Sequence, residues 1–216
     1  MEEKTLTVFL FLKVRARKSG QAVKLLSTAY EEIKEAAAVY AETDVIARAS
    51  ASESRTGEIL LELMQGAIHV HDKTHGTRDI FQVDSVQPYL VDGTLSRLQT
   101  ENMKDLSGAI YSYVVIEIDE RQGTRGQVLQ ELQRCDGIIY TAGLSVKPRV
   151  IAKVKAPNKM AFDNNIMEQI QNIPGVATTR SLLIINDMHF IRNESFNITE
   201  ASINPVSDWA AKGRRS

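Results

Sequence analysis

Hydrophobic residues in this chain follow two periods that alternate along its length. Val8–Leu12 is a continuous apolar run bounded by charged residues, which is typical of a strand buried on both faces. The segment after Ser19 instead carries apolar residues at the spacing of one helix face, at Ala22, Leu25, Leu26, Ala29 and Ile33. The pattern then predicts strands over 36–40 and 44–50, a helix capped by Ser52 or Ser54, and a strand over 77–86. The order of elements is β-α-β-β-α-β.

The same order returns in the second half of the chain. The pattern predicts strands over 113–118, 138–144, 149–155 and 179–185, and helices over 124–135 and 158–173. Two segments also match residue by residue. Asp44-Val-Ile-Ala-Arg-Ala aligns with Arg149-Val-Ile-Ala-Lys-Val, about 105 positions later. We interpret the repeat as an internal duplication.

The apolar strands constrain how the two halves pack. Val8–Leu12 and Leu182–Ile185 are apolar at both alternating positions, whereas one β-α-β-β-α-β unit covers only one face of its sheet with helices. The uncovered face must meet another surface, and the sheet of the other half is the nearest candidate. We therefore expect an α+β fold in which two sheets pack face to face as an α/β barrel or sandwich within one chain.

Composition argues against several classes of function. The formal net charge is -1, which disfavours a nucleic-acid-binding surface over the whole protein. The single cysteine, Cys135, cannot form an internal disulfide. No apolar run is long enough to span a bilayer, and the N-terminus enters a strand without a signal segment. We expect a cytoplasmic protein with neither a membrane nor a nucleic acid as a direct partner.

Three segments of the second half together resemble the effector-binding (RAM) domain of the Lrp/AsnC regulators. They are Tyr113-Val-Val-Ile-Glu-Ile, Cys135-Asp-Gly-Ile, and Ile173-Pro-Gly-Val-Ala-Thr-Thr-Arg-Ser-Leu-Leu-Ile-Ile. The resemblance covers about residues 111–187 well and residues 5–90 more weakly. It implies ferredoxin-like, ACT-like βαββαβ units that pair as an intrachain dimeric α/β barrel. It also implies amino-acid binding, a link to transcription regulation and assembly into homo-oligomers.

The resemblance predicts the domain organisation as well. We expect a first Lrp/AsnC-like domain over 1–91, a linking helix over 92–107, a second such domain over 108–187, and a C-terminal extension over 188–216. Members of the family usually begin with a helix-turn-helix domain, whereas the first strand here starts near residue 5. Direct operator binding is therefore not expected.

The hairpin before the third strand of each half carries the best candidates for ligand binding. The candidates are Glu42, Thr43 and Asp44 in the first half and Ser145, Lys147 and Arg149 in the second. In such turns, side chains and free backbone groups can contact the ammonium or carboxylate group of a small molecule. The cations of the second hairpin would suit an anionic group. Ordinary hairpin polarity explains the same residues without a ligand.

A cluster of histidines provides a candidate metal site. His69, His71 and His75 form His-x-His-x-x-x-His with Asp72 between them, in a segment predicted as a loop. Imidazoles two positions apart on an extended segment point to the same side, and a third could complete a zinc, copper or nickel site. The alternative is a solvated loop with no bound metal.

The sequence contains no evident set of catalytic residues. It has no phosphate-binding glycine loop, no Cys-x-x-Cys and no His-Glu-x-x-His. We therefore expect a non-enzymatic small-molecule sensor or regulatory protein, with an amino acid as ligand, that acts through oligomerisation or a protein partner. Three alternatives stay open: a dimeric α/β-barrel enzyme, a metal-binding module that uses His69, His71 and His75, and a purely structural scaffold that oligomerises. No cofactor is expected apart from that metal.

Overall fold

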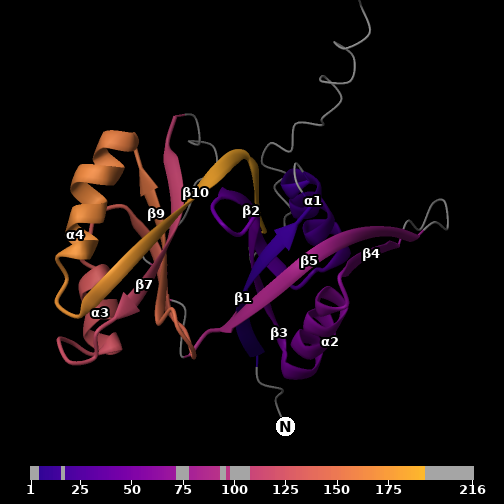
Figure 1. Cartoon of the computed structure of the whole chain (residues 1–216), viewed down its shortest axis with the longest axis horizontal. Coiled ribbons are helices and arrows are strands. Elements are labelled where there is room, and N and C mark those ends of the chain that lie inside the picture. Colours follow the sequence, from indigo (N-terminus) through magenta and orange to yellow (C-terminus); the bar gives the residue numbers. More distant parts are fainter. Residues whose placement is uncertain (1–4, 16–17, 72–77, 93–95, 98–107, 193–216) are drawn as a thin grey trace, which may run out of the picture.

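The computed structural model describes residues 5–15, 18–71, 78–92, 96–97 and 108–192 of the 216-residue chain. Within them the fold is α+β, as predicted, with helices on the two outer flanks and strands between them (Figure 1). None of the helices in these residues is long and apolar enough to cross a membrane.

The first half forms a βαββαβ unit with one additional strand. Its elements are β1 (Thr5–Val14), α1 (Ser19–Ala29), β2 (Ile33–Tyr40), β3 (Val45–Ser52), α2 (Glu53–Met64), β4 (Ala67–His71) and β5 (Arg78–Leu90). The Ser52 hydroxyl accepts a hydrogen bond from the Arg55 backbone nitrogen, so Ser52 caps α2 as predicted. The additional strand is β4, which pairs with β5 where the sequence predicted a loop.

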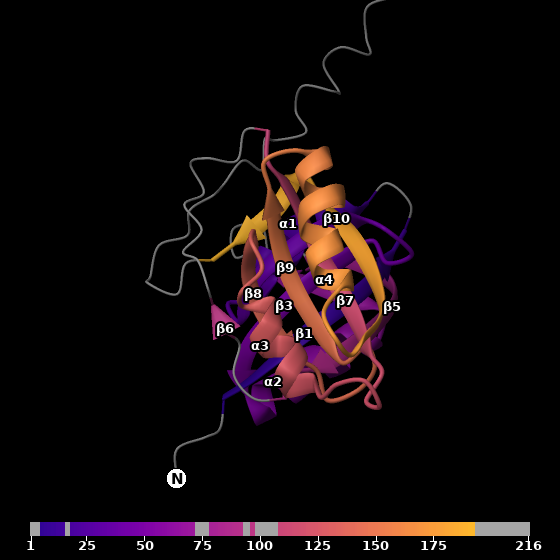
Figure 2. The ribbon, with the colours of Figure 1, turned by 90° about the vertical axis from the view of Figure 1, so that its left-hand side faces the viewer.

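The second half repeats this order. Its elements are β6 (Ser96–Arg97), β7 (Ile110–Ile118), α3 (Arg125–Leu132), β8 (Ile138–Gly143), β9 (Val150–Ala156), the π-helix η2 (Ala161–Met167), α4 (Glu168–Gln171) and β10 (Val176–Ile191). A capping box of Thr124 and Gln127 starts α3. The last predicted helix is therefore a π-helix followed by a single α-helical turn. Figure 2 shows α3 and α4 in front of the strands of this half.

Two predicted boundaries differ from the structure. Ser96–Arg97 form β6, which pairs with β8, so these two residues are not part of a linking helix. The rest of the predicted linker, at 93–95 and 98–107, lies outside the described residues. At the other end, β10 continues to Ile191, past the predicted domain boundary at residue 187. In both places an edge strand offers backbone hydrogen-bonding groups that the extra segment satisfies.

The strand order is the same in the two halves. The described strands form one 10-stranded sheet with the order β4-β5-β1-β3-β2-β10-β7-β9-β8-β6. The order β5-β1-β3-β2 in the first half corresponds to β10-β7-β9-β8 in the second. Neighbouring strands of the sheet pair antiparallel throughout, from β1 with β3 to β8 with β9.

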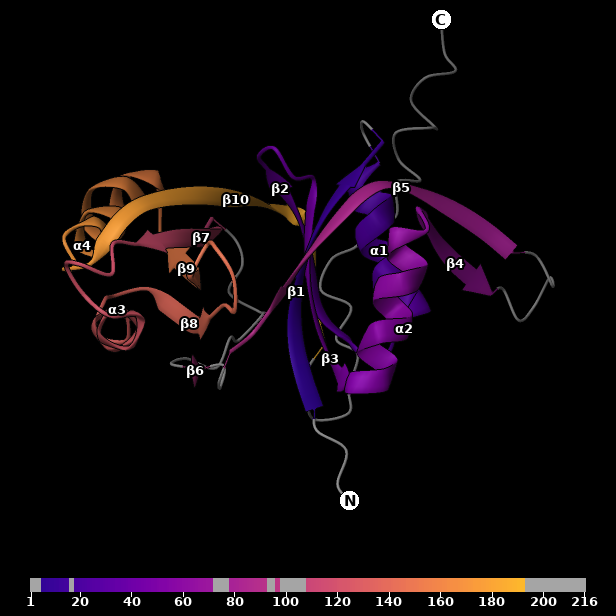
Figure 3. The ribbon, with the colours of Figure 1, turned by 60° about the horizontal axis from the view of Figure 1, so that its bottom comes forward.

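The two halves meet at two junctions. At the first, β10 pairs with β2, with His189 opposite Ala37. At the second, an antiparallel bridge joins Val91 to Leu144, and the Asp92 backbone nitrogen lies 2.9 Å from the Gly143 oxygen. Figure 3 shows β10 reaching across from the second half to β2. The inner faces of the two half-sheets are thereby held toward each other.

Both faces of the sheet are buried, which explains the apolar runs of the sequence. In β1, Leu10 and Leu12 pack into an outer core with α1 and α2, whereas Phe9 and Phe11 point to the inner face. The inner core contains residues from both halves, so each sheet covers the other. Burial on both faces selects apolar residues at every position of such a strand.

A pair of glycines provides a test of the local packing. Gly137 has a φ of 71°, and a Cβ atom there would lie 2.5 Å from the Lys155 carbonyl oxygen. We expect Gly137→Ala to lower the free energy of unfolding by at least about 1–2 kcal/mol. Gly57 lies in α2, where an added Cβ atom would meet no described neighbour within 4 Å, so Gly57→Ala should raise it by about 0.5–1 kcal/mol. Chemical denaturation measures both, and equal effects would contradict the prediction.

Candidate active site

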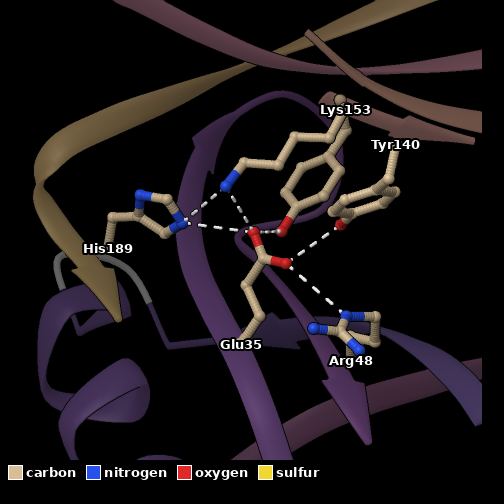
Figure 4. A network of polar contacts seen from close by, with 6 residues as sticks. Glu35, Arg48, Tyr140, Lys153 and His189 are labelled. Atoms are coloured by element: carbon tan, nitrogen blue, oxygen red, sulfur yellow. Dashed lines mark hydrogen bonds and ion pairs between the residues drawn. The ribbon is translucent and has the colours of Figure 1, made fainter. Parts of the chain in front are cut away.

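Six polar side chains from six strands meet on the inner face of the sheet. Figure 4 shows them around the Glu35 carboxylate, and each is almost completely buried. We call them the Glu35 cluster: Glu35 on β2, Arg48 on β3, Tyr113 on β7, Tyr140 on β8, Lys153 on β9 and His189 on β10. The cluster therefore exists only because the two halves face each other.

Glu35 is the hub of the cluster. Its Oε1 atom lies 2.9 Å from the Lys153 Nζ, accepts a 2.7 Å hydrogen bond from the Tyr113 hydroxyl, and is 3.2 Å from the His189 Nε2. Its Oε2 atom accepts a 3.0 Å hydrogen bond from the Tyr140 hydroxyl and lies 3.6 Å from the Arg48 Nε. These contacts satisfy both carboxylate oxygens, which makes burial of the charge tolerable.

The strand register places the cluster residues at equivalent positions of the two halves. In the first half, Arg48 lies opposite both Phe9 and Glu35 on its neighbouring strands. In the second half, Lys153 lies opposite both Tyr113 and Tyr140 in the same way. Each half thus contributes one cation from its central strand, whereas only the first half contributes a carboxylate.

The electrostatics keep the carboxylate ionised. Burial alone would raise the pKa of the Glu35 carboxyl, because a buried charge loses its hydration. The charge of Lys153, the hydrogen bond and charge of His189 and the charge of Arg48 outweigh burial and hold that pKa well below its ordinary value. Glu35 is therefore a carboxylate at neutral pH.

The two phenols of the cluster keep their protons. Burial and the neighbouring Glu35 carboxylate raise the pKa of both Tyr113 and Tyr140 well above the ordinary value. His189 lies 3.4 Å from the Lys153 Nζ as well as near Glu35, so it links a cation to the carboxylate. An ionised acid, an imidazole and protonated phenols in mutual contact are the groups that carry general acid–base chemistry.

The hairpin of the first half uses its polar groups for structural contacts. Thr43 donates a hydrogen bond to the Leu12 carbonyl, and Asp44 accepts one from the Val14 backbone nitrogen, both at 2.9 Å. Glu42 forms an exposed ion pair with Arg180 of the other half at 3.3 Å. Ligand binding by Glu42, Thr43 and Asp44 stays a prediction.

The hairpin of the second half brings two of its three predicted residues together. The Arg149 Nη1 atom lies 3.4 Å from the Ser145 carbonyl oxygen, and its Nη2 atom is 3.5 Å from Glu120. Lys147 precedes Pro148 through a cis peptide bond. No hydrogen bond or ion pair described for this hairpin reaches the Glu35 cluster, and anion binding here stays a prediction.

The histidine segment does not form the predicted loop over its whole length. His69 and His71 belong to β4, opposite Ile80 and Arg78 of β5, whereas His75 lies outside the described residues. Among the residues that the structure describes, no group of three histidine, cysteine, aspartate or glutamate side chains could hold a metal ion. A site completed by His75 stays a prediction.

Sequence reasoning missed the Glu35 cluster, although one signal was present. The matching segments that start at Asp44 and Arg149 each carry a cation at their fifth position, Arg48 and Lys153, within otherwise apolar strands. A cation repeated at the centre of a buried strand requires a buried partner. Nothing local in the sequence identifies Glu35 as that partner.

Comparison with known proteins places the second half in a family context. Residues 113–189 match the family model of the Lrp/AsnC ligand binding domain, as the resemblance predicted. No curated protein matches the chain. The description of that family model names ligand binding and does not say which ligand.

Two solved structures share the fold over most of the chain. One is the siroheme decarboxylase NirDL, with a TM-score of 0.59, 8% sequence identity, and coverage of 89% of this chain and 75% of that chain. The other is the same enzyme in co-complex with an iron-uroporphyrin III analogue, with a TM-score of 0.57, 8% identity, and coverage of 87% and 73%.

These findings correct the functional prediction. The expectation of a non-enzymatic sensor or regulatory protein is contradicted, because the two solved structures reported above, which share this fold, are those of an enzyme. No local catalytic motif marks the Glu35 cluster in the sequence, because its six residues come from six separate strands. The chain thus combines the fold of a decarboxylase with a segment, residues 113–189, that matches the Lrp/AsnC ligand binding domain.

Proposed function

We propose that this chain is an enzyme that transfers protons at the Glu35 cluster and removes carbon dioxide from a carboxylate-bearing tetrapyrrole. The observation that carries the proposal is the cluster itself, in which both halves supply polar groups to one buried centre. Buried acid–base groups in mutual contact are characteristic of catalytic sites. The shared fold with siroheme decarboxylase supports tetrapyrroles as the first substrate class to test.

We further infer that the chain is a duplicated unit closed as an intrachain dimeric α/β barrel. Three observations support this inference: the equal strand orders, the two junctions, and the inner core drawn from both halves. The equivalent register of Arg48 and Lys153 supports duplication in the same way. In such a barrel the Glu35 cluster lies in the interior.

The cluster fits the proton balance of a decarboxylation. The bond between the carboxylate carbon and the substrate carbon breaks, its electron pair stays on the substrate carbon, and carbon dioxide leaves. A proton must then reach that carbon. Tyr113, Tyr140 and His189 are the groups that can deliver it, and the Glu35 carboxylate, within hydrogen-bond distance of all three, holds them together. The overall reaction needs no oxidant.

The experiment is a turnover assay with siroheme, with the product identified by mass spectrometry. Wild-type protein should release carbon dioxide and produce the decarboxylated tetrapyrrole. The double variant Tyr113→Phe/Tyr140→Phe should lose at least about 100-fold in rate, because both phenol groups that donate to Glu35 are removed. Tyr40→Phe is the matched control, because Tyr40 is 69% exposed and outside the cluster. Absence of turnover by wild-type protein, or full activity of the double variant, would refute the proposal.

A further inference from the structure

One further tyrosine of the inner face, Tyr111, lies next to the six residues of the Glu35 cluster and has no role in the proposed function. It is two residues before Tyr113 on β7, so both side chains point to the same face of the sheet. The Tyr111 side chain is 1% exposed, and its hydroxyl has no hydrogen-bond partner among the described residues. A buried hydroxyl without a partner is unfavourable, and its presence calls for an explanation.

Two lysines flank the Tyr111 ring. The Lys153 Nζ lies 5.5 Å and the Lys155 Nζ 5.7 Å from the ring centroid. Lys155 is directly opposite Tyr111 in the β7–β9 register. Lys153 already contacts Glu35 at 2.9 Å, whereas the contact described for the Lys155 side chain is with this ring. Tyr111 therefore combines an unpartnered hydroxyl with a ring that lies near a second ammonium group, that of Lys155.

The level of Tyr111 is also where the interior becomes more accessible. Lys155 is partly exposed, whereas Lys153, one step inward on the same face, is completely buried. The equivalent positions of the first half, Thr7 and Ser50, are opposite each other and partly exposed as well. Both are smaller than the Tyr111 and Lys155 side chains of the second half. A ligand approaching the cluster from this end would meet the partly exposed Lys155 before the buried Tyr111.

We propose that Tyr111 and Lys155 form a carboxylate-binding subsite that receives an acidic arm of the substrate and directs it toward Glu35. This proposal rests on the proposed function, which locates the decarboxylation at the Glu35 cluster. The Tyr111 hydroxyl donates a hydrogen bond to the carboxylate, and the Lys155 ammonium provides the opposite charge. The ligand then satisfies a hydroxyl that is unsatisfied without it. Only the acidic arm has to enter the subsite, and the bulk of a large ligand stays outside.

The test is a binding titration that does not depend on turnover. Iron-uroporphyrin III is the probe, and its absorbance band reports binding to the full chain. Tyr111→Phe and Lys155→Gln should each weaken binding about tenfold, the loss expected for one hydrogen bond to a charged group. The matched controls are Tyr40→Phe and Lys24→Gln, which change exposed residues and should leave the dissociation constant unchanged.

A second ligand isolates the contribution of the carboxylate groups to binding. The methyl ester of iron-uroporphyrin III has neutral arms, so wild-type protein and both variants should bind it equally weakly. Tyr111→Phe should also melt no lower than wild-type protein without ligand, because the lost hydroxyl has no partner among the described residues. The subsite proposal would be contradicted if both variants bound iron-uroporphyrin III as tightly as wild-type protein does. A lower melting temperature of Tyr111→Phe would also contradict it.

The same measurements separate this inference from the proposed function. Tight binding of iron-uroporphyrin III that depends on Tyr111 and Lys155, without any turnover of siroheme, would support the carboxylate-binding subsite and refute the proposed decarboxylase activity. If both variants turned over siroheme at the wild-type rate, the result would support the proposed decarboxylase activity and refute the subsite.

Discussion

Replacing Glu35 with glutamine is expected to lower the free energy of unfolding by about 3–5 kcal/mol, the loss typical of breaking a buried ion pair from one side. The variant keeps the size of the side chain but removes its charge. Lys153, which is completely buried, and Arg48, which is 3% exposed, then lose the carboxylate that each contacts. Because water cannot replace it, the desolvation cost of the cations is no longer offset.

Chemical denaturation of Glu35→Gln and wild-type protein measures this difference. The matched control is Glu42→Gln, because Glu42 also pairs with an arginine across the two halves but its side chain is 90% exposed. An exposed pair contributes at most about 1 kcal/mol. Equal effects of the two variants would show that the Glu35 cluster does not stabilise the fold.

The pH dependence gives an independent check of the Glu35 effect. The pKa of Glu35 is lower in the folded protein than its ordinary value. Such a group contributes stability above its unfolded pKa of about 4.3, and this contribution is lost as the pH falls through the folded pKa. The stability difference between wild-type protein and Glu35→Gln should therefore be full at pH 7 and shrink in strong acid. If this stability difference instead grew as the pH fell, the pKa of Glu35 would not be lowered in the folded protein.

Replacing His189 with glutamine is expected to lower the turnover rate by about 100- to 10,000-fold, the range typical of a lost acid–base group. The His189 Nε2 atom lies 3.2 Å from Glu35 and 3.4 Å from the Lys153 Nζ. A glutamine amide can hydrogen-bond at this position, but it cannot accept and release a proton near neutral pH. The fold should therefore persist while proton delivery stops.

Initial rates with siroheme across a range of pH test this expectation. Wild-type protein should show a pH dependence that the residual rate of His189→Gln lacks. Met188→Leu is the control, because it changes the neighbouring, 37% exposed residue on the same strand. The role of His189 in proton transfer would be excluded by a variant that keeps the wild-type rate and the wild-type pH profile.

The strands and the recurring order of elements could be predicted because the signal of each element is local. Val8–Leu12 is apolar at every position, and the structure buries alternate residues of β1 in the outer and inner cores. Ser52 caps α2 because its hydroxyl reaches a backbone nitrogen three residues away. Such contacts depend on neighbours in the chain, so periodicity and residue type are sufficient to predict them.

For the predicted ligand-binding residues, the sequence did not identify hydrogen-bond partners that are distant along the chain. Asp44 and Thr43 looked available for a ligand because they lie in a polar turn. Their partners, Val14 and Leu12, belong to the end of β1, about 30 residues earlier in the sequence. The histidine segment was predicted as a loop for the same reason, because pairing of β4 with β5 depends on a partner strand rather than on the residues of β4.

The sequence by itself determined the α+β order of elements, the burial of its strands on both faces, and the resemblance of about residues 111–187 to the Lrp/AsnC ligand binding domain, which the match over residues 113–189 confirms. Only the tertiary structure decided the candidate site. Glu35 and His189 are 154 positions apart, and they meet at 3.2 Å because β10 of the second half pairs with β2 of the first. Charges within apolar strands mark where a partner is needed, but which charge supplies it is decided by how the sheets face each other.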